Sequence, residues 1–501
     1  MPASSELVVV PGRTPLVLVA PHGGRRDPAR RPWGEGAQKV NDLHTAALTL
    51  ELAEATGGAA LVNAHVDRND VDLNRLSAAH DHAPEFLERL TELLDAALHR
   101  YGRAVVATVH GWNVVQPVVD VGLGCRPGEV AGGAVSPDFA GTTLRALVAA
   151  LEAEGIVATL GARYPARARE NLVQLFTTRH RDDPRPLVRG LAARGARCEA
   201  VQLECGIPLR WPGPWRTRLV RALATGLAVP PSVSAGPTAV GADCAPLATA
   251  RHTLQFTSPD VSGLAALDPV GGRLLLLPRT GGLVLFTGER AGHTAPERVG
   301  ALAMAAAADG SVQLTYDGPV LRFPDTAPFV DLEHGLTRAA LGEASVTLAF
   351  APRHAGAHDA GEFGIASGRV VLDGRPLAVE ARAFAEDRLP LAGDARIRGA
   401  LTLDDERAVS FAVSAAGAAS GFVCTGTGHL PVVAASATTP AEDRLALTVE
   451  VASGERLRLD ARILDRLPVV RRRSGTPVRG RFVTCAVGSA APAGWCEMDG
   501  G

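Results

Sequence analysis

The chain has 501 residues and a formal net charge of −2, from 51 basic and 53 acidic side chains. This balance excludes the broad basic field typical of nucleic-acid-binding proteins, and the length implies at least two domains. The seven cysteines include no C-x-x-C pair, and no run of about 18 apolar residues or secretory leader pattern is present. We therefore expect a reduced, cytoplasmic protein that binds neither nucleic acid nor membrane.

Residues 1–229 combine short apolar runs with longer segments of helical spacing. This alternation predicts an α/β domain with a mostly parallel sheet flanked by helices. The expected strands are 16–20, 59–63, 104–109, 156–160 and 199–203, and the expected helices are 42–56, 84–100, 141–154 and 214–227.

The pattern changes after the first domain. Residues 230–246 are rich in Pro, Gly, Ser and Ala and lack periodicity, so we interpret them as a linker. From 247 to 501 short β-type runs are joined by turn signals, among them Asp317-Gly318 and Asp373-Gly374, which read as two-residue hairpin turns. This half is predicted to be an all-β domain, either a sandwich or a lipocalin-like barrel able to hold an apolar ligand.

Three buried strands of the first domain lead into an ionisable residue with glycine close behind. They deliver His22 before Gly23-Gly24, His110 before Gly111, and Glu204 before Cys205-Gly206. The carboxyl ends of parallel strands meet at one edge of a sheet, where α/β proteins build their sites. The sequence therefore predicts that His22, His110 and Glu204 converge.

Two imidazoles and a carboxylate are suitable ligands for a catalytic zinc ion, which commonly takes three protein ligands. For the third ligand we favour Asp42, at the start of the first predicted helix, over Glu35 and His44. Asp42 also has a structural interpretation, because an aspartate in this position is a good helix N-cap.

A polar stretch, HVDRNDVDLNRL at 65–76, follows the second predicted strand and ends close to Asn74-Arg75. An arginine binds a carboxylate in bidentate fashion and a neighbouring amide adds direction, so this pair is suited to a substrate carboxylate. The alternative is a surface loop with local salt bridges.

Two other groups of residues are interpreted as structural. Cys205 is expected in or near the core rather than as a nucleophile. The stretch RHAGAHDAGEFG at 353–364 is expected to be a polar loop rather than a second metal site, although it contains His354, His358, Asp359 and Glu362.

Five short motifs occur in the order and at the intervals of a known family. They are PHGG at 21–24, D-x-H at 42–44, VDLNR at 71–75, VHGW at 109–112 and VQLECGIPLR at 201–210. Together they make about the first 225 residues resemble the N-formylglutamate amidohydrolase family. The chain departs from that family at Thr108, where an acid usually precedes the histidine by two residues and can orient its imidazole.

The resemblance implies a zinc-carboxypeptidase-like α/β fold. It also implies that His22, Asp42 and His110 hold Zn²⁺, that Asn74 and Arg75 receive a substrate carboxylate, and that Glu204 is the general base.

The expected function is therefore zinc-dependent hydrolysis of an amide or related acyl bond in a small, carboxylate-bearing substrate such as an N-acyl amino acid. The alternative is a non-catalytic, degenerate hydrolase whose β domain binds a hydrophobic small molecule. The zinc content of the purified protein distinguishes the two.

Overall fold

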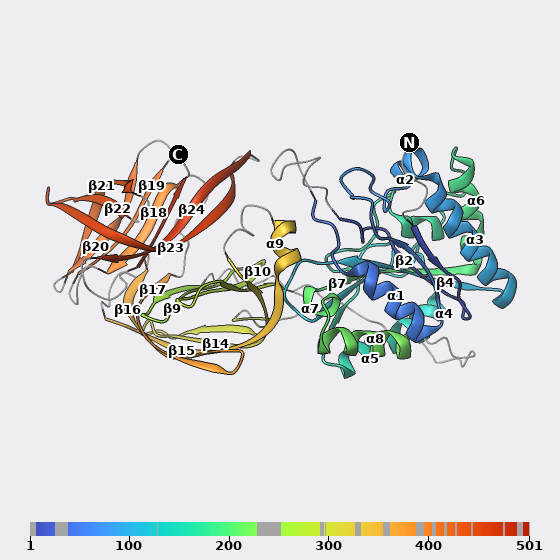
Figure 1. Cartoon of the computed structure of the whole chain (residues 1–501), viewed down its shortest axis with the longest axis horizontal. Helices are drawn as coiled ribbons and strands as arrows, with labels where there is room; N and C mark the ends of the chain where they lie inside the picture. The colour runs from blue at the N-terminus through green and yellow to red at the C-terminus, as the bar shows by residue number, and fades with distance from the viewer. Residues whose placement is uncertain are drawn as a thin grey trace. The chain divides into compact units, whose positions relative to one another are not determined.

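The computed structural model describes residues 7–25, 39–127, 129–227, 252–290, 295, 297–325, 332–353, 361–386, 395–402, 407–414, 418–425, 428–441, 444–473, 476–487 and 494–499. The described residues up to Leu227 form one compact unit, and those from His252 onward form a second (Figure 1). The predicted linker at 230–246 lies outside the described residues, so the domain boundaries stay a prediction. Among the helices that the structure describes, none is long and apolar enough to cross a membrane.

The first unit is built on a seven-stranded sheet in the order β1-β3-β2-β4-β7-β5-β6. Its strands are β1 (Leu7–Val10), β2 (Leu16–Ala20), β3 (Ala59–Asn63), β4 (Ala104–Gly111), β5 (Val118–Gly122), β6 (Val157–Thr159) and β7 (Cys198–Cys205). The central strands β3, β2, β4 and β7 are parallel, whereas β1 and β5 run antiparallel to β3 and β7. The sheet is therefore mixed, with a parallel centre.

Helices cover both faces of this sheet (Figure 1). Because successive strand residues point to opposite faces, Leu18 packs with helices α1 (Thr45–Thr56), α5 (Arg145–Ala153) and α8 (Pro214–Gly226), whereas Val19 packs with α3 (Pro84–Tyr101) and α6 (Pro186–Arg194). The helices are α1 (Thr45–Thr56), α2 (Leu76–His82), α3 (Pro84–Tyr101), α4 (Pro137–Phe139), α5 (Arg145–Ala153), α6 (Pro186–Arg194), α7 (Ile207–Arg210) and α8 (Pro214–Gly226), with a π-helical turn at Ala140–Leu144 and 3₁₀ turns at Leu172–Phe176 and Gly195–Arg197.

The helix predicted at 42–56 begins later than expected. His44 has a positive φ of 68°, in the left-handed region, so the helix starts at Thr45 and leaves Asp42 in the preceding turn. The Asp42 side chain is consequently not committed to helix geometry.

The described part of the second unit is built of β-strands, as predicted, apart from one short helix. It contains a ten-stranded antiparallel sheet, whose strands β11 and β14 also pair with each other, and a closed barrel of β18 to β25. The sheet consists of β8 (His252–Thr257), β9 (Val261–Leu267), β10 (Gly271–Pro278), β11 (Leu283–Glu289), β12 (Arg298–Val299), β13 (Leu302–Ala306), β14 (Val312–Phe323), β15 (Ala340–Pro352), β16 (Glu362–Leu372) and β17 (Arg375–Glu386), with helix α9 (Leu332–Arg338) between β14 and β15.

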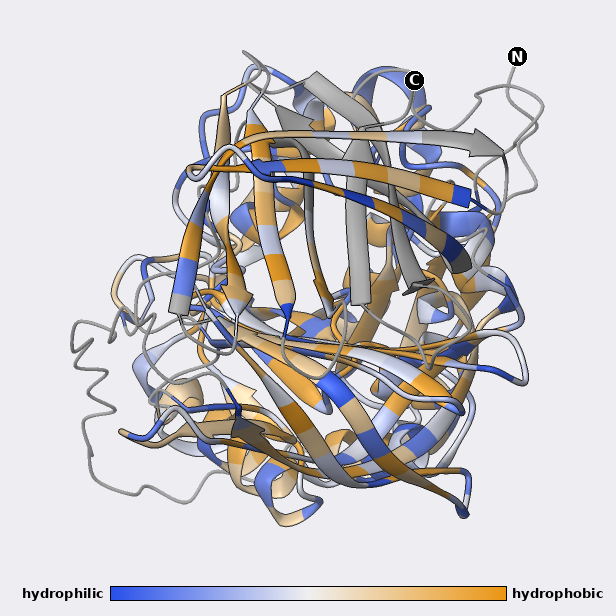
Figure 2. Cartoon of the chain, turned by 90° about the vertical axis from the view of Figure 1, so that its left-hand side faces the viewer, coloured by the Kyte–Doolittle hydropathy of each residue, from blue (hydrophilic) through white to orange (hydrophobic). Residues whose placement is uncertain are grey.

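The barrel consists of β18 (Ala395–Thr402), β19 (Ala408–Ser414), β20 (Ala419–Thr425), β21 (Gly428–Ala441), β22 (Arg444–Val451), β23 (Arg456–Arg473), β24 (Thr476–Val487) and β25 (Gly494–Asp499). Hydrophobic and hydrophilic residues alternate along many strands of the second unit (Figure 2). In the barrel, side chains including Val409, Phe411, Leu447 and Val449 form one apolar cluster. In a closed barrel, such a cluster is the interior.

The two predicted hairpin turns have opposite outcomes. Asp373 and Gly374 have positive φ values of 47° and 78° and connect β16 to β17, as a type I′ turn requires. The turn at Asp317-Gly318 is wrong, because both residues lie inside β14 and pair with β15 opposite Ser345 and Ala344. A continuous strand there satisfies backbone groups that a turn would leave unpaired.

Candidate metal centre

The three strand ends singled out in the sequence lie together in the structure. Strands β2, β4 and β7 are parallel neighbours, and His110 on β4 is the register partner of Glu204 on β7. His22 follows β2 after Pro21. His110 and Glu204 are each the second-last residue of their strand and do not lie in loops. The hydrogen bonds between β4 and β7 therefore position both side chains.

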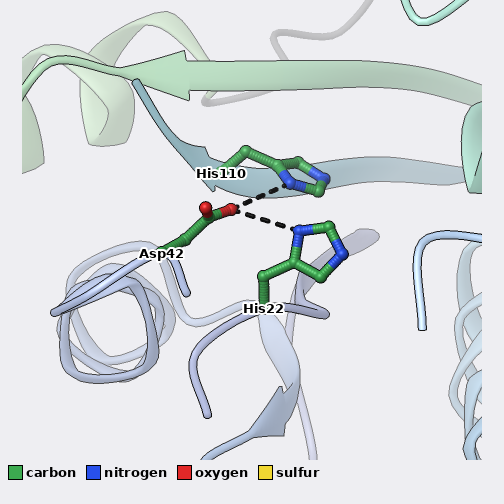
Figure 3. Close-up of side chains that lie close together, drawn as sticks. All are labelled: His22, Asp42 and His110. Atoms are coloured by element: carbon green, nitrogen blue, oxygen red, sulfur yellow. Dashed lines mark hydrogen bonds and ion pairs between the residues drawn. The ribbon is translucent and has the colours of Figure 1, made fainter. Parts of the chain in front are cut away.

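His22, Asp42 and His110 form a buried group with one potential ligand atom from each residue (Figure 3). Asp42 Oδ2 lies 3.3 Å from His22 Nδ1 and 3.2 Å from His110 Nδ1. All three ligand atoms lie within 4.8 Å of one another. Among the described residues, this is the group of His, Cys, Asp and Glu side chains that could hold a metal ion.

The donor set fits a zinc ion. Zinc binds imidazole nitrogen and carboxylate oxygen at about 2.1 Å, which in a tetrahedral site places neighbouring ligand atoms about 3.4 Å apart. The two nitrogen-to-oxygen distances in the group, 3.3 and 3.2 Å, are close to this spacing. Three protein ligands would leave a fourth position for water or substrate.

The Asp42 carboxylate is oriented from outside the group. Arg68 Nη1 donates a hydrogen bond to Asp42 Oδ1 at 3.0 Å, which leaves Oδ2 for the histidines. Burial acts to raise the pKa of Asp42, but hydrogen bonds from His110 and His22 and the charge of Arg68 hold it well below its usual range. The Asp42 carboxylate is therefore ionised at neutral pH, as a metal ligand must be. The side chain does not cap helix α1, for which no side-chain cap bond exists.

The two histidines differ in the hydrogen-bond partner of Nε2, the ring nitrogen that is not a potential metal ligand. His22 Nε2 lies 2.7 Å from Asp72 Oδ1, an arrangement that orients the ring for a metal at Nδ1. His110 Nε2 is buried and has no hydrogen-bond partner among the described residues. Thr108, two residues earlier on β4, stands where the resembled family has an acid, and its hydroxyl is also without a partner.

Glu204 is a buried carboxylate beside this group. Burial raises the pKa of Glu204 to about 7, with Asp42 and Asp120 adding to the rise and His110 and Arg68 opposing it. Gln202 Nε2 donates a hydrogen bond to Glu204 Oε1 at 2.9 Å. A carboxylate with a pKa near neutrality can both accept and return a proton.

The Arg210 side chain hydrogen-bonds to backbone and amide oxygens close to the group, and not to Glu204. Its guanidinium is fully buried and donates to the backbone oxygens of Cys205, Leu43 and Trp112 and to the Asn113 side chain. Arg210 therefore ties the ends of β4 and β7 to the turn before α1.

Asn74 and Arg75 lie on the segment that carries Asp72. Leu172 N donates a hydrogen bond to Asn74 Oδ1 at 3.3 Å, which directs the donor end of the amide, Nδ2, away from Leu172. The Arg75 side chain is 41 % exposed, and its Nε lies 3.9 Å from Asp72 Oδ2. Neither residue forms a hydrogen bond or ion pair with the three potential ligands.

Of the other sequence candidates, His44 and Cys205 are described and are not part of the group. The His44 ring packs against Trp211, and burial, with the charges of Arg210 and Arg216, lowers the pKa of His44 to about 4. Burial raises the pKa of the Cys205 thiol to about 12, which agrees with a core residue. Glu35 lies outside the described residues, as do His354, His358 and Asp359 of the proposed polar loop, whereas Glu362 lies on β16.

Sequence reasoning missed Arg68, Asp72, Gln202 and Asn171. The polar stretch at 65–76 contains the first two, but its pattern does not show which acid reaches His22. Gln202 shares a strand face with Glu204 because it lies two residues earlier. Asn171 carries no signal, since its contact with Gln202 spans 31 residues.

Comparisons with known proteins give fold similarities at low identity. The sequence matches no protein-family model and no curated protein. N-formylglutamate amidohydrolase from Ralstonia eutropha JMP134 is 16 % identical, and the match covers 45 % of this chain and 96 % of that chain with a TM-score of 0.31. A gene product from Agrobacterium tumefaciens is 14 % identical and covers 45 % of this chain and 94 % of its own, also at 0.31.

A third solved structure, a protein described as AttH from Nitrosomonas europaea, is 14 % identical. The match covers 50 % of this chain and 91 % of that chain, with a TM-score of 0.31. At these values the matches assign the chain to no family and transfer no activity to it.

Proposed function

We propose that the chain is a zinc-dependent hydrolase of an amide or related acyl bond in a small, carboxylate-bearing substrate of the N-acyl amino acid type. The observation that carries this proposal is the meeting of His22 Nδ1, Asp42 Oδ2 and His110 Nδ1 in one buried group beside the carboxylate of Glu204. The resemblance of the first 225 residues to the N-formylglutamate amidohydrolase family supports the same class of reaction.

In this proposal His22, Asp42 and His110 hold the ion, which when bound supplies Lewis acidity to the scissile carbonyl. Glu204 accepts a proton from the attacking water, whose oxygen forms the new bond to the carbonyl carbon. Glu204 then returns that proton to the leaving nitrogen as the carbon–nitrogen bond breaks. Arg75 and Asn74 Nδ2 bind the substrate carboxylate and thereby position the acyl bond beside the ion and Glu204.

The substitution Glu204→Gln tests the proposal, because glutamine keeps the shape and loses the basicity. The purified protein should contain about one equivalent of zinc and hydrolyse at least one member of a panel of N-acyl amino acids. We expect Glu204→Gln to keep zinc and melting temperature and to lose roughly 10²- to 10⁴-fold in kcat.

His22→Ala and His110→Ala serve as the complementary variants, and both should lose most of the zinc. His80→Ala is the matched imidazole control, since His80 lies in helix α2 and pairs with Asp81. Unchanged turnover of Glu204→Gln with a lowered melting temperature would remove Glu204 from the mechanism.

The second candidate function is binding of an apolar small molecule by the closed barrel. The apolar cluster inside β18 to β25 favours it. Absence of zinc, together with tight binding of an apolar fluorescent probe, would support a binding protein over the hydrolase.

A further inference from the structure

A directed chain of hydrogen bonds leads from a loop to Glu204. Val173 N donates to Asn171 Oδ1 at 2.9 Å, Asn171 Nδ2 donates to Gln202 Oε1 at 2.8 Å, and Gln202 Nε2 donates to Glu204 Oε1 at 2.9 Å. The side chains of Asn171, Gln202 and Glu204 are all buried. This series of hydrogen bonds therefore runs through the protein interior, where water does not compete for the donors and acceptors.

The donor and acceptor roles in this series of hydrogen bonds are fixed by its first member, a backbone N–H. A backbone N–H can only donate, so Asn171 must present its oxygen to Val173 and its amino group to Gln202. Gln202 then presents its oxygen to Asn171 and its amino group to Glu204. Reversing either amide would place two acceptors or two donors face to face in a buried site, at a cost of about 1–3 kcal/mol for each unpaired group.

The same loop also reaches the residues proposed to bind substrate. Asn171 is the N-cap of the 3₁₀ turn Leu172–Phe176, and the next backbone N–H, of Leu172, donates to Asn74 Oδ1. Glu170 accepts hydrogen bonds from the backbone of Leu76 and Ser77. One short segment, residues 170–173, thus contacts both the proposed base, through Gln202, and the proposed substrate anchor.

We propose that Gln202 positions Glu204 for proton transfer, and that Asn171 sets the orientation in which Gln202 can do so. This inference rests on the hydrolase function proposed above. Gln202 occupies Oε1 of Glu204 and leaves Oε2 as the oxygen that exchanges the proton with water and the leaving nitrogen. Both Gln202 and Asn171 act through Glu204, so they are positioning residues and not catalytic ones.

The central experiment compares Gln202→Leu and Asn171→Asp with the wild-type full chain loaded with zinc, using a panel of N-acyl amino acids. Gln202→Leu removes the donor to Glu204 at similar volume. Asn171→Asp offers Gln202 an acceptor where it needs a donor, so the Gln202 amide must reverse and present its oxygen to Glu204.

A misplaced catalytic group costs on the order of 10²-fold in rate. We expect kcat to fall by about 10- to 100-fold in both variants, with KM within about two-fold of wild type.

Thr108→Val is the matched control. Thr108 is the register partner of Gln202 on β4, is equally buried, and its hydroxyl has no hydrogen-bond partner among the described residues. Valine has the same shape, so zinc content, kcat and KM should not change. A second arm, Gln202→Glu, keeps the length of the side chain but places a carboxylate against Glu204, and it should lose kcat as Gln202→Leu does.

The outcomes separate this inference from the proposed function. If the wild type hydrolyses no member of the panel, the hydrolase function fails and the positioning role fails with it. If the wild type is active but Gln202→Leu keeps full kcat, or loses only melting temperature, the positioning role is overturned and the hydrolase function stands. A loss of kcat in Gln202→Leu without a loss in Asn171→Asp overturns the part assigned to Asn171.

Discussion

At the scale of single residues, the strand ends were predictable and their partners were not. His22, His110 and Glu204 follow or end apolar runs, and a parallel sheet brings such positions to one edge whatever the intervening sequence. Asp72 and Arg68 reach the group through contacts that span 50 and 26 residues. No local pattern encodes which side chain of a polar loop makes such a contact.

Asp72 shows how such a partner can be tested. Its Oδ1 lies 2.7 Å from His22 Nε2 and its Oδ2 lies 3.1 Å from Lys39 Nζ. Asp72→Ala removes the acceptor that orients the His22 ring, and we expect zinc affinity to fall about 10- to 100-fold. Competition with a chromophoric chelator measures this change.

The matched control is Asp70→Ala, which removes an exposed carboxylate from the same loop and should leave zinc affinity within about two-fold of wild type. Equal affinities for wild type and Asp72→Ala would show that the ring of His22 is oriented by its packing alone.

At the scale of elements, the five expected strands match described strands, whereas β1 and β5 were not predicted. Strand β5 escaped prediction because Asp120, fully buried, interrupts its apolar run. The Asp120 carboxylate accepts hydrogen bonds from the Thr159 hydroxyl and from the backbone of Ala162, Arg163 and Tyr164. A buried acid is tolerated only with such partners, and they come from the end of β6 and the residues after it, 39 to 44 residues further along the sequence.

The loop before helix α6 is held by another buried acid, whose effect on stability depends on pH. Asp183 Oδ2 lies 2.7 Å from His180 Nδ1, and Arg185 Nε donates to Asp183 Oδ1 at 2.8 Å. The hydrogen bonds from Arg185 and His180 hold the pKa of Asp183 below its usual range, although burial opposes them. A lowered folded-state pKa stabilises the fold above the unfolded-state value, near 3.9, and this stabilisation is lost as pH falls toward the folded-state value.

We therefore expect Asp183→Asn to lower the free energy of unfolding by about 2 kcal/mol at pH 7. The deficit should shrink as the pH falls below about 4, because the Asp183 carboxylate of the unfolded wild-type chain then begins to protonate while that of the folded chain stays ionised. Urea unfolding at several pH values measures both quantities. Asp182→Asn is the control, because Asp182 is the exposed neighbour. A deficit that stays constant down to pH 3 would show that shape rather than charge holds this loop.

At the scale of the whole molecule, the change of periodicity between the two halves predicted an α/β part and a β part, and the described residues divide accordingly. The arrangement of the β half was not predictable, because a run of antiparallel hairpins fits a sandwich, an open sheet or a barrel equally well. Closure of the barrel depends on the pairing of its first and last strands, β18 and β25, for example of Leu401 with Gly494, which short-range turn signals do not determine.

The division of the described residues into two units predicts that the first unit folds and binds metal without the second. All the proposed metal and substrate residues precede Leu227, and the apolar side chains around the seven-stranded sheet pack with helices of the same unit. A chain truncated at residue 228 should therefore fold, bind about one equivalent of zinc and keep the circular dichroism of an α/β domain. Calorimetry of the full chain should then contain a transition at the melting temperature of the fragment, within a few degrees. An unfolded fragment alongside a stable full chain would mean that the two halves share a core, and the boundary placed at 230–246 would be wrong.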